Sequence, residues 1–401
     1  NRQTEQEYPS ARSVTRGYTD RDQLATLSVD GTQVAGMSYD PGMRETERAL
    51  GNGLTTGRGY GRGDNLVTAI NTPGAIAFQY AYDANKRKTA EFDRFFRLRG
   101  QSFAYDAEDR LYNWSRIESL GLWGGSDPYA GILPATRGWT LSPVGDWEQV
   151  DSGGTVEDRT HNAVHELNER LIAGQGPVAL SYDAKGNLTS DGTQQYTWDF
   201  DNRLATATGL ADGASASYRY DALGRRVQKT VVDAGGTATV TTFALSGAQV
   251  VAEYVDGVLA REFVYGSYVD EAVVMLDFTV VPSGYEVYWY HCNHLYSVAA
   301  VTDTTGNVVE RYGYDAYGDS VVLDASGSPV AGNESTVGQP YRFTGRRLDA
   351  ETGLSYFRAR YMDHELGRFI GRDPQGSSKP AGGYHDGMSL YCGWFVPFKV
   401  D

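Results

Sequence analysis

The feature that most constrains this chain is a recurring Tyr-Asp dipeptide, because it fixes where the backbone can turn. It occurs six times, at residues 39, 82, 105, 182, 220 and 314, with a tryptophan variant at residue 198. Counting the aromatic residue as first, the fifth position is Gly186, Gly224 or Gly318 in three copies, Asp109 or Asn202 in two, and Met43 and Lys86 in the exceptions. Glycine accepts a positive φ freely, and Asn and Asp tolerate it best among the others. The pattern therefore predicts a left-handed residue at the fifth position, with Met43 and Lys86 as the exceptions. A positive φ is specifically predicted at the three glycines.

Each copy predicts a strand, a tight turn and a second strand. The aspartate can accept a hydrogen bond from the backbone two residues on, which closes the turn. Clear copies lie 16 residues apart from Tyr182 to Trp198 and 23 apart from Tyr82 to Tyr105. A hairpin of this length cannot bury an apolar face alone, so neighbouring hairpins must stack. Helical patterns are scarce, and for the ambiguous segments 87–99 and 107–120 the repeat context favours strands. We predict an all-β protein.

Charge and composition exclude several classes of partner. The chain of 401 residues has 36 Lys and Arg against 51 Asp and Glu, a net charge of −15. A nucleic-acid footprint needs a basic face, so no nucleic-acid partner is expected. No apolar run reaches the 18 residues of a membrane span, so no span is expected in this segment. Because the sequence opens at Asn1 without a methionine or a signal peptide, we interpret it as a piece of a longer protein.

No residue set indicates a metal or a cofactor. The two cysteines, Cys292 and Cys392, form neither a disulfide framework nor a ligand set, and two ordinary buried thiols are the favoured interpretation over a single bridge. His291 and His294 could suggest a metal site, but residues three apart on a strand face opposite sides. Structural, hydrogen-bonded histidines are therefore favoured. No phosphate-binding loop or metalloprotease motif occurs, and we expect no cofactor.

Residues 341–376 form the densest stretch of the chain and read YRFTGRRLDAETGLSYFRARYMDHELGRFIGRDPQG. Seven arginines alternate there with aromatic residues and glycines. Arginines in such a setting could bind anions, but internal ion pairs and stacking on tyrosine faces are favoured. We predict that Tyr356, Tyr361 and Phe369 are largely buried, and that at least two of these arginines contact carboxylates or aromatic rings.

This stretch closely resembles the Rhs repeat-associated core, which ends the YD-repeat shells of bacterial Rhs toxins, toxin-complex C components, wall-associated YD proteins and teneurins. The resemblance is carried by Tyr341–Gly345, Thr352–Leu354, Tyr356, Arg358–Tyr361, Leu366–Phe369 and Arg372–Pro374. Weaker similarity to YD repeats covers about 18–227 and then 261–318, where Tyr296 replaces a common glycine and is expected to alter a local turn.

The resemblance implies a spirally wound strip of antiparallel hairpins that forms part of a hollow shell. It divides the chain into a YD-repeat shell at 1–260, a pre-core region at 261–340, and a terminal plug or inward-turned end at 341–401. The implied function is encapsulation and delivery of a toxin that follows the core, and the implied partners are that cargo and other shell or secretion-system components. The expected location is secreted or at the cell surface, in a bacterium.

A second interpretation comes from the teneurin-like and wall-associated members of the same family. Their shells serve as extracellular recognition or adhesion surfaces, which implies a cell-surface receptor or a glycan as partner and no catalysis. A third interpretation is a scaffolding fragment without activity. The sequence leaves all three open.

The resemblance also implies a self-cleaving site. Residues 372–376 match the family's Arg-Asp-Pro-x-Gly element, which in Rhs toxins and toxin-complex C components belongs to an aspartyl-type autoprotease. Carried over, Asp373 supported by Arg372 is one carboxylate of the pair, and Asp386 or Asp401 is the other. Two carboxylates in one site can divide the roles of base and acid, because their pKa values are pushed apart. The alternative is that Asp373 only caps the turn before Pro374.

Overall fold

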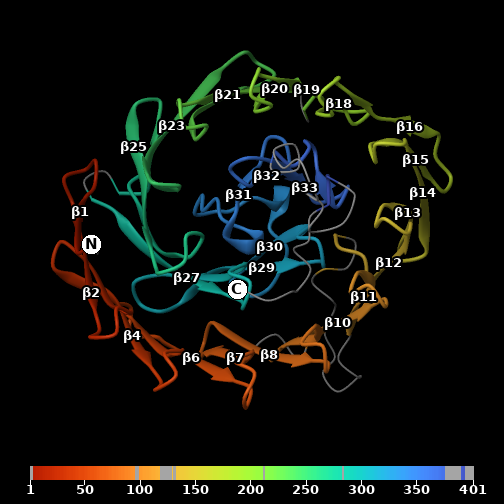
Figure 1. The fold of residues 1–401 in the computed structure, drawn as a ribbon. Helices are drawn as coiled ribbons and strands as arrows, with labels where there is room; N and C mark the ends of the chain where they lie inside the picture. The colour runs from red at the N-terminus through yellow and green to blue at the C-terminus, as the bar shows by residue number, and fades with distance from the viewer. Residues whose placement is uncertain are drawn as a thin grey trace.

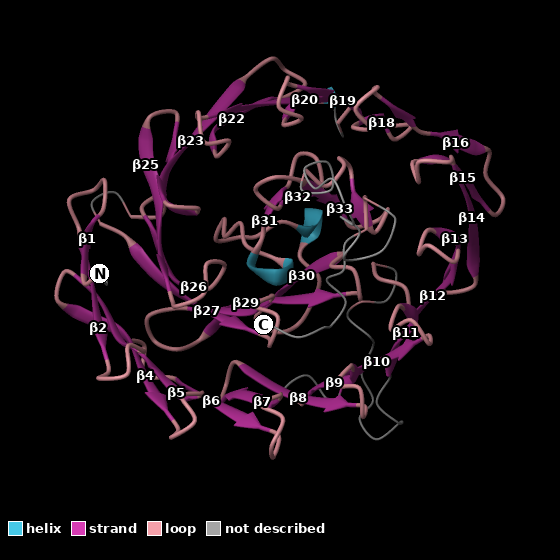
Figure 2. Ribbon diagram, viewed as in Figure 1, coloured by secondary structure: helices cyan, strands magenta, loops and turns pink. Residues whose placement is uncertain are grey.

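The computed structural model describes residues 3–94, 99–117, 129, 132–210, 213–281, 284–374 and 390–392. These residues form three antiparallel sheets, and the described part of the chain has no α-helix, only the single 3₁₀ turns η2 (Ala331–Asn333) and η3 (Phe343–Gly345) (Figure 2). The all-β prediction is therefore confirmed. The ambiguous segments are strands where they are described, because β9, β10 and β11 occupy them.

The first sheet has sixteen strands: β1 (Glu5–Glu7), β2 (Ser13–Tyr18), β3 (Leu24–Val29), β4 (Thr32–Tyr39), β5 (Glu45–Leu50), β6 (Thr55–Tyr60), β7 (Val67–Thr72), β8 (Ile76–Tyr82), β9 (Lys88–Asp93), β10 (Arg99–Tyr105), β11 (Leu111–Ile117), β12 (Thr136–Leu141), β13 (Trp147–Ser152), β14 (Thr155–His161), β15 (Leu167–Ile172) and β16 (Pro177–Ala179).

The second sheet has fourteen strands: β17 (Ser181–Tyr182), β18 (Leu188–Ser190), β19 (Gln195–Trp198), β20 (Leu204–Thr208), β21 (Ser215–Tyr220), β22 (Arg226–Val232), β23 (Ala238–Ser246), β24 (Gln249–Val255), β25 (Val258–Tyr265), β26 (Ala272–Asp277), β27 (Glu286–Cys292), β28 (Val298–Thr302), β29 (Val308–Tyr314) and β30 (Ser320–Asp324). The third has four: β31 (Arg347–Asp349), β32 (Leu354–Tyr356), β33 (Tyr361–Asp363) and β34 (Arg368–Phe369).

In every sheet the strand order is the sequence order, so the chain is one continuous meander. The hairpins follow one another around a ring, and the last part of the chain lies inside that ring (Figure 1). The predicted division at residue 260 falls within β25, where the pairing with β24 shifts register at Ala260 and then continues. We call β1–β30 the wall, and residues 341–374, which hold the third sheet, the plug.

The turns of the Tyr-Asp copies share one geometry. Gly186, Gly224 and Gly318 have φ of 86°, 76° and 94°, which confirms the predicted left-handed conformation. Met43 and Lys86, the exceptions by residue type, adopt it as well, with φ of 66° and 67°. The reason is that the N–H of the fifth residue donates to the carbonyl of the aspartate, as Lys86 does to Asp83 at 3.0 Å. The turn therefore imposes the conformation even where the side chain opposes it.

The turn around Tyr296 does not differ from the others, contrary to expectation. Tyr296 has φ of 61°, and its N–H donates to the Asn293 carbonyl at 3.0 Å, as in the Tyr-Asp copies. Its ring stacks on Tyr268, with 4.5 Å between ring centroids. This stacking offsets part of the backbone strain that a bulky residue meets at positive φ.

Replacing Lys86 by glycine should stabilise the protein, since the left-handed strain disappears and the turn keeps its hydrogen bonds. We expect the free energy of unfolding to rise by about 0.5–1 kcal/mol. Urea denaturation of the wild type and the variant measures it. Ala84→Gly in the same turn is the matched control, because Ala84 does not have a positive φ and its replacement should only destabilise.

Recurring contacts link the Tyr-Asp turns to their neighbours along the wall. The carboxylate of Asp83 accepts the Asn85 and Arg87 N–H groups, each at 2.9 Å, and the Arg87 Nε at 2.6 Å. Arg87 then donates to the carbonyl of Asp106 in the next turn at 3.2 Å. The first-position tyrosines reach the preceding repeat, as Tyr82 does to the Val67 carbonyl at 2.8 Å. Because antiparallel strands alternate in direction, all these turns lie along one edge of the wall.

The wall winds into a spiral with its core between the windings. Leu27 and Val34 of the first winding pack in one buried cluster with Val274 and Trp289, more than 200 positions later in the sequence. The indole N–H of Trp289 donates to the Val34 carbonyl at 3.0 Å. Strands β27–β29 lie inside β4–β8, as the spiral prediction requires (Figure 1).

The plug lies inside the ring and packs against both sheets of the wall (Figure 1). Leu354 and Tyr361 pack with Leu204 of the second sheet, while Phe369 packs with Trp114 of the first. Tyr361 and Phe369 are each 2% exposed, which confirms their predicted burial. Tyr356 is only half-buried.

Candidate functional site

Ion pairs lock the plug to the wall. The arginines of the plug pair with wall carboxylates: Arg346 and Arg358 with Asp270, Arg347 with Glu253, and Arg372 with Glu166. In the opposite sense, plug carboxylates pair with wall cations: Asp349 with Arg226 and Lys229, Glu351 with Lys229, and Glu365 with Arg170. The predicted carboxylate contacts of these arginines are confirmed, which favours the structural role over binding of an outside anion.

The end of the plug carries the predicted carboxylate Asp373. Its Oδ2 lies 3.1 Å from Nη2 of Arg360, and its side chain is 35% exposed. Arg372, the expected support, points elsewhere: its Nη2 lies 2.8 Å from Glu166 Oε1 on the wall. The guanidinium that faces Asp373 is therefore that of Arg360. Both predicted partner residues, Asp386 and Asp401, lie outside the described residues.

A short segment at residues 390–392 adds itself to the edge of the plug. The backbone of Cys392 forms an isolated antiparallel β-bridge with that of Arg368, and the Phe369 N–H donates to the Tyr391 carbonyl at 2.9 Å. The Asp373 N–H donates to the Leu390 carbonyl at 3.0 Å. The backbone of the candidate carboxylate is thus held against a segment 17 residues further along the chain.

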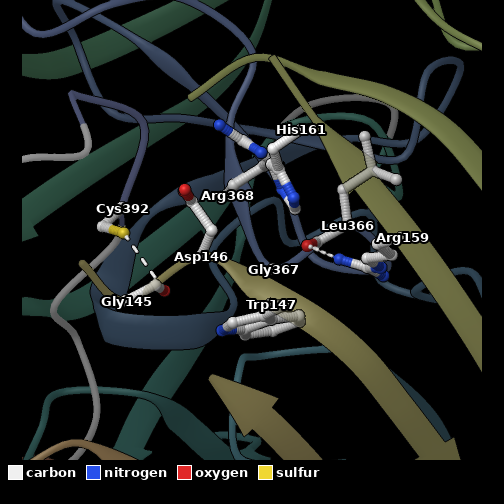
Figure 3. Close-up of a pocket in the computed structure, with 9 residues that line it drawn as sticks. All are labelled: Gly145, Asp146, Trp147, Arg159, His161, Leu366, Gly367, Arg368 and Cys392. Atoms are coloured by element: carbon white, nitrogen blue, oxygen red, sulfur yellow. Dashed lines mark hydrogen bonds between the residues drawn. The ribbon is translucent and has the colours of Figure 1, made fainter. Parts of the chain in front are cut away.

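A small pocket lies beside this segment, between the plug, the turn before β13 and the end of β14 (Figure 3). Its lining is Gly145, Asp146, Trp147, Arg159, His161, Leu366, Gly367, Arg368 and Cys392. The cavity measures about 20 Å³, room for one ordered water. Burial and the charge of Arg368 lower the pKa of His161 to about 4, so this histidine is neutral at pH 7. His165 Nδ1 lies 2.6 Å from Asp146 Oδ2 next to the pocket.

These wall residues have a sequence signal that was missed. The sixth position of the Tyr-Asp turns is arginine in five copies: Arg44, Arg87, Arg110, Arg203 and Arg225. In three related turns it is acidic instead: Asp146, Glu166 and Asp319. These three turns lie against the plug, at the pocket, at Arg372 and at His364 respectively. Each turn with an acidic sixth position thus lies against the C-terminal part of the chain.

The acidic sixth residue Asp319 lies near a second carboxylate, that of Asp315. In the other Tyr-Asp turns the side chain of the sixth residue donates to the carboxylate of the second-position aspartate, as Asn187 Nδ2 does to Asp183 Oδ2 at 2.9 Å. In the last turn Asp319 cannot donate while ionised, and Asp315 is paired with Arg137. Burial, together with the charge of Asp315, raises the pKa of Asp319 to about 7.

The stability of the protein should therefore depend on pH through Asp319. An unfolded aspartate titrates near pH 3.9, so between about pH 4 and pH 7 the folded state binds more protons, and stability falls as the pH rises. Asp319→Asn should remove this slope and stabilise the protein more at pH 8 than at pH 4.5. Urea denaturation at both pH values measures it. An equal effect at both would contradict the assignment.

The histidines and cysteines first considered as metal ligands have structural surroundings. His291 Nε2 lies 2.9 Å from Thr302 Oγ1, and burial, with the charge of Arg311, lowers the His291 pKa to about 3. His294 packs against Tyr80. Within the described ranges no group of three or more His, Cys, Asp or Glu could hold a metal ion. Cys292 and Cys392 are half-buried thiols that form no disulfide. No helix of the described residues is long and apolar enough to span a membrane.

Comparison with known proteins finds relatives of this chain in both sequence and structure. A family model described as Teneurin YD-shell matches residues 155–381, more than half of the chain. The tRNA3(Ser)-specific nuclease WapA of Bacillus spizizenii is 31% identical over 244 residues, 60% of this chain and 10% of that protein. Toxin subunit YenC1 of Yersinia entomophaga is 23% identical over 428 residues, 91% of this chain and 42% of that subunit.

Among solved structures, the crystal structure of TcdB2-TccC3 superposes with a TM-score of 0.75 at 18% identity, over 97% of this chain and 21% of that one. At this identity the match establishes the fold. The chain thus spans between 10% and 42% of the length of these proteins.

Proposed function

Because the chain belongs to the teneurin YD-shell family, we propose that it is the plugged end of a longer β-shell that encloses a toxic polypeptide. The observation that carries the proposal is the inward spiral, whose last strands form a plug tied by ion pairs to the surrounding wall. The relatives named above are a nuclease and a toxin subunit, which favours a toxin cargo over a recognition surface. The proposal divides this secreted bacterial protein into a shell at 1–260, a pre-core region at 261–340 and a terminal unit at 341–401, which includes the plug.

The proposal includes self-cleavage that frees the cargo from the shell. Asp373, paired with Arg360, takes a proton from a water molecule, and the water oxygen attacks the scissile carbonyl carbon. The second carboxyl, of Asp386 or Asp401, gives its proton to the leaving amide nitrogen. One water is consumed and one peptide bond is broken. The exposure of Asp373 and its position beside the segment 390–392 support this role.

The test expresses the chain with its native C-terminal extension and separates it on a denaturing gel. Wild type should give two bands that stay together in native size-exclusion chromatography, and Asp373→Asn should give one. Asp201→Asn, at an exposed wall turn, is the control and should still split. If Asp373→Asn splits as fast as wild type, the site assignment is wrong.

Encapsulation is tested separately with a protease added to the intact Asp373→Asn protein. An enclosed extension should resist digestion until denaturant opens the shell, because the protease cannot reach it. Immediate digestion of the extension would overturn encapsulation and favour the recognition-shell alternative.

A further inference from the structure

Tyr391 is the most buried of residues 390–392, the described part of the segment that follows the plug. Its side chain is 0% exposed, although the residue lies 17 positions beyond Pro374. Its hydroxyl donates to the Gly186 carbonyl at 2.7 Å and accepts from Arg372 Nε at 3.0 Å, with Glu166 Oε1 at 3.2 Å. The guanidinium of Arg368 lies 4.7 Å above its ring. A phenol enclosed in this way is strongly held, because its hydroxyl has three hydrogen-bond partners and its ring faces a guanidinium.

Two wall turns build this socket. Glu166 is the acidic sixth residue of one turn, and Gly186 is the left-handed fifth residue of the next. A Cβ on Gly186 would overlap both Arg372 Nε and the Tyr391 hydroxyl. Gly224 has the same role in its own turn, but a Cβ there would meet only Arg203 Nη1, at 3.9 Å. Glycine at 186 is thus required by the socket, whereas the turn alone accepts other residues at this position.

The backbone alone holds the segment weakly. Residues 390–392 form an isolated bridge with Arg368 instead of a full ladder, and few backbone hydrogen bonds join them to the plug. Each such bond contributes only about 1 kcal/mol net. The buried side chain of Tyr391 fixes the register, because a shift by one residue would put Leu390 or Cys392 at a polar socket.

We infer that Tyr391 in this socket is a positioning residue for self-cleavage, which fixes the segment leaving the plug beside Asp373. The inference rests on the proposed function. The contact that links the two is short: the Asp373 N–H donates to the carbonyl of Leu390, the neighbour of Tyr391, and Arg360, the partner of Asp373, reaches the same carbonyl at 3.5 Å. Loss of the tyrosine releases this carbonyl and with it the alignment of the carboxylate.

The test uses the full chain with its native extension and two readouts. The first is the rate of self-cleavage. The second is the rate at which a maleimide labels Cys392, followed by mass spectrometry, because Cys392 is half-buried next to the socket. Tyr391→Ala and Gly186→Ala should slow cleavage about 100-fold, as a misplacement of roughly 1 Å does, and should speed labelling. Tyr391→Phe, which keeps the ring, should have a smaller effect on both.

Gly224→Ala is the matched control, since it carries the same backbone strain without touching the socket, and it should leave both rates unchanged. If Tyr391→Ala cleaves at the wild-type rate while Asp373→Asn does not cleave, the inference is overturned and the proposed function stands. If wild type does not cleave at all, the cleavage proposal fails and the positioning role fails with it. In that case unchanged labelling of Cys392 in Tyr391→Ala would also overturn the socket as a tether.

Discussion

Replacing Gly367 by alanine should destabilise the protein by more than about 3 kcal/mol, because the plug could no longer seat on the wall. Gly367 has φ of 67°, and a Cβ at this position would overlap the six-membered ring of Trp147. Trp147 cannot move aside easily, since it packs against Trp139 and Tyr317 at centroid distances of 5.3 and 4.5 Å. Guanidinium denaturation followed by tryptophan fluorescence measures the loss.

The matched control is Gly353→Ala in the same plug. Gly353 has φ of 73°, and nothing lies within 4 Å of its would-be Cβ. Only the backbone strain remains there, so we expect a loss of about 1 kcal/mol. If the two variants lose equal stability, the contact between Gly367 and Trp147 does not hold the plug in place.

Glu310→Gln should cost about 3–5 kcal/mol, because one buried carboxylate holds the loop that leads into the plug. Glu310 is fully buried, and its two oxygens accept from the Tyr312 hydroxyl, from Ser335 Oγ at 2.7 Å, from Thr336 N–H and Oγ1, and from Val337 N–H at 3.2 Å. A glutamine offers only one carbonyl oxygen to these five donors, and with its amide nitrogen at the Oε2 position it would force the hydroxyls of Tyr312 and Ser335 to accept instead of donate. Thermal unfolding and urea denaturation both report the loss.

Removing single donors is the control for this carboxylate. Tyr312→Phe and Ser335→Ala each take away one of the hydrogen bonds and leave the charge accepting from the others, so each should cost about 1–2 kcal/mol. A glutamine variant as stable as these two would show that the Glu310 carboxylate does not hold the loop that leads into the plug.

The turns show how far local rules extend. The fifth position of a Tyr-Asp copy could be predicted from Gly186, Gly224 and Gly318, since φ depends on atoms within the same five residues. The same rule explains why Met43, Lys86 and Tyr296 follow the glycines, which residue type alone did not suggest: the hydrogen bond to the second-position carbonyl closes the turn whatever the side chain.

The site shows where such rules end. The motif at 372–376 identified Asp373, but the pairing of Arg360 with Asp373 and of Arg372 with Glu166 depends on the plug meeting a wall turn about 200 residues earlier. Glu166, Gly186 and Tyr391 form one socket only because two consecutive wall turns and the segment 390–392 converge. The acidic sixth position of the turn was visible in the sequence, but its meaning was not.

The sequence by itself therefore determined the strands, the turns and their order, because strand pairing between neighbours and turn conformation depend on short stretches of chain. The tertiary structure alone decided which winding lies on which, as Val34 on Trp289, and which charges meet across the ring, as Arg372 and Glu166. These contacts depend on the curvature of the wall. Curvature is the sum of small twists over thirty strands, so no local pattern specifies it.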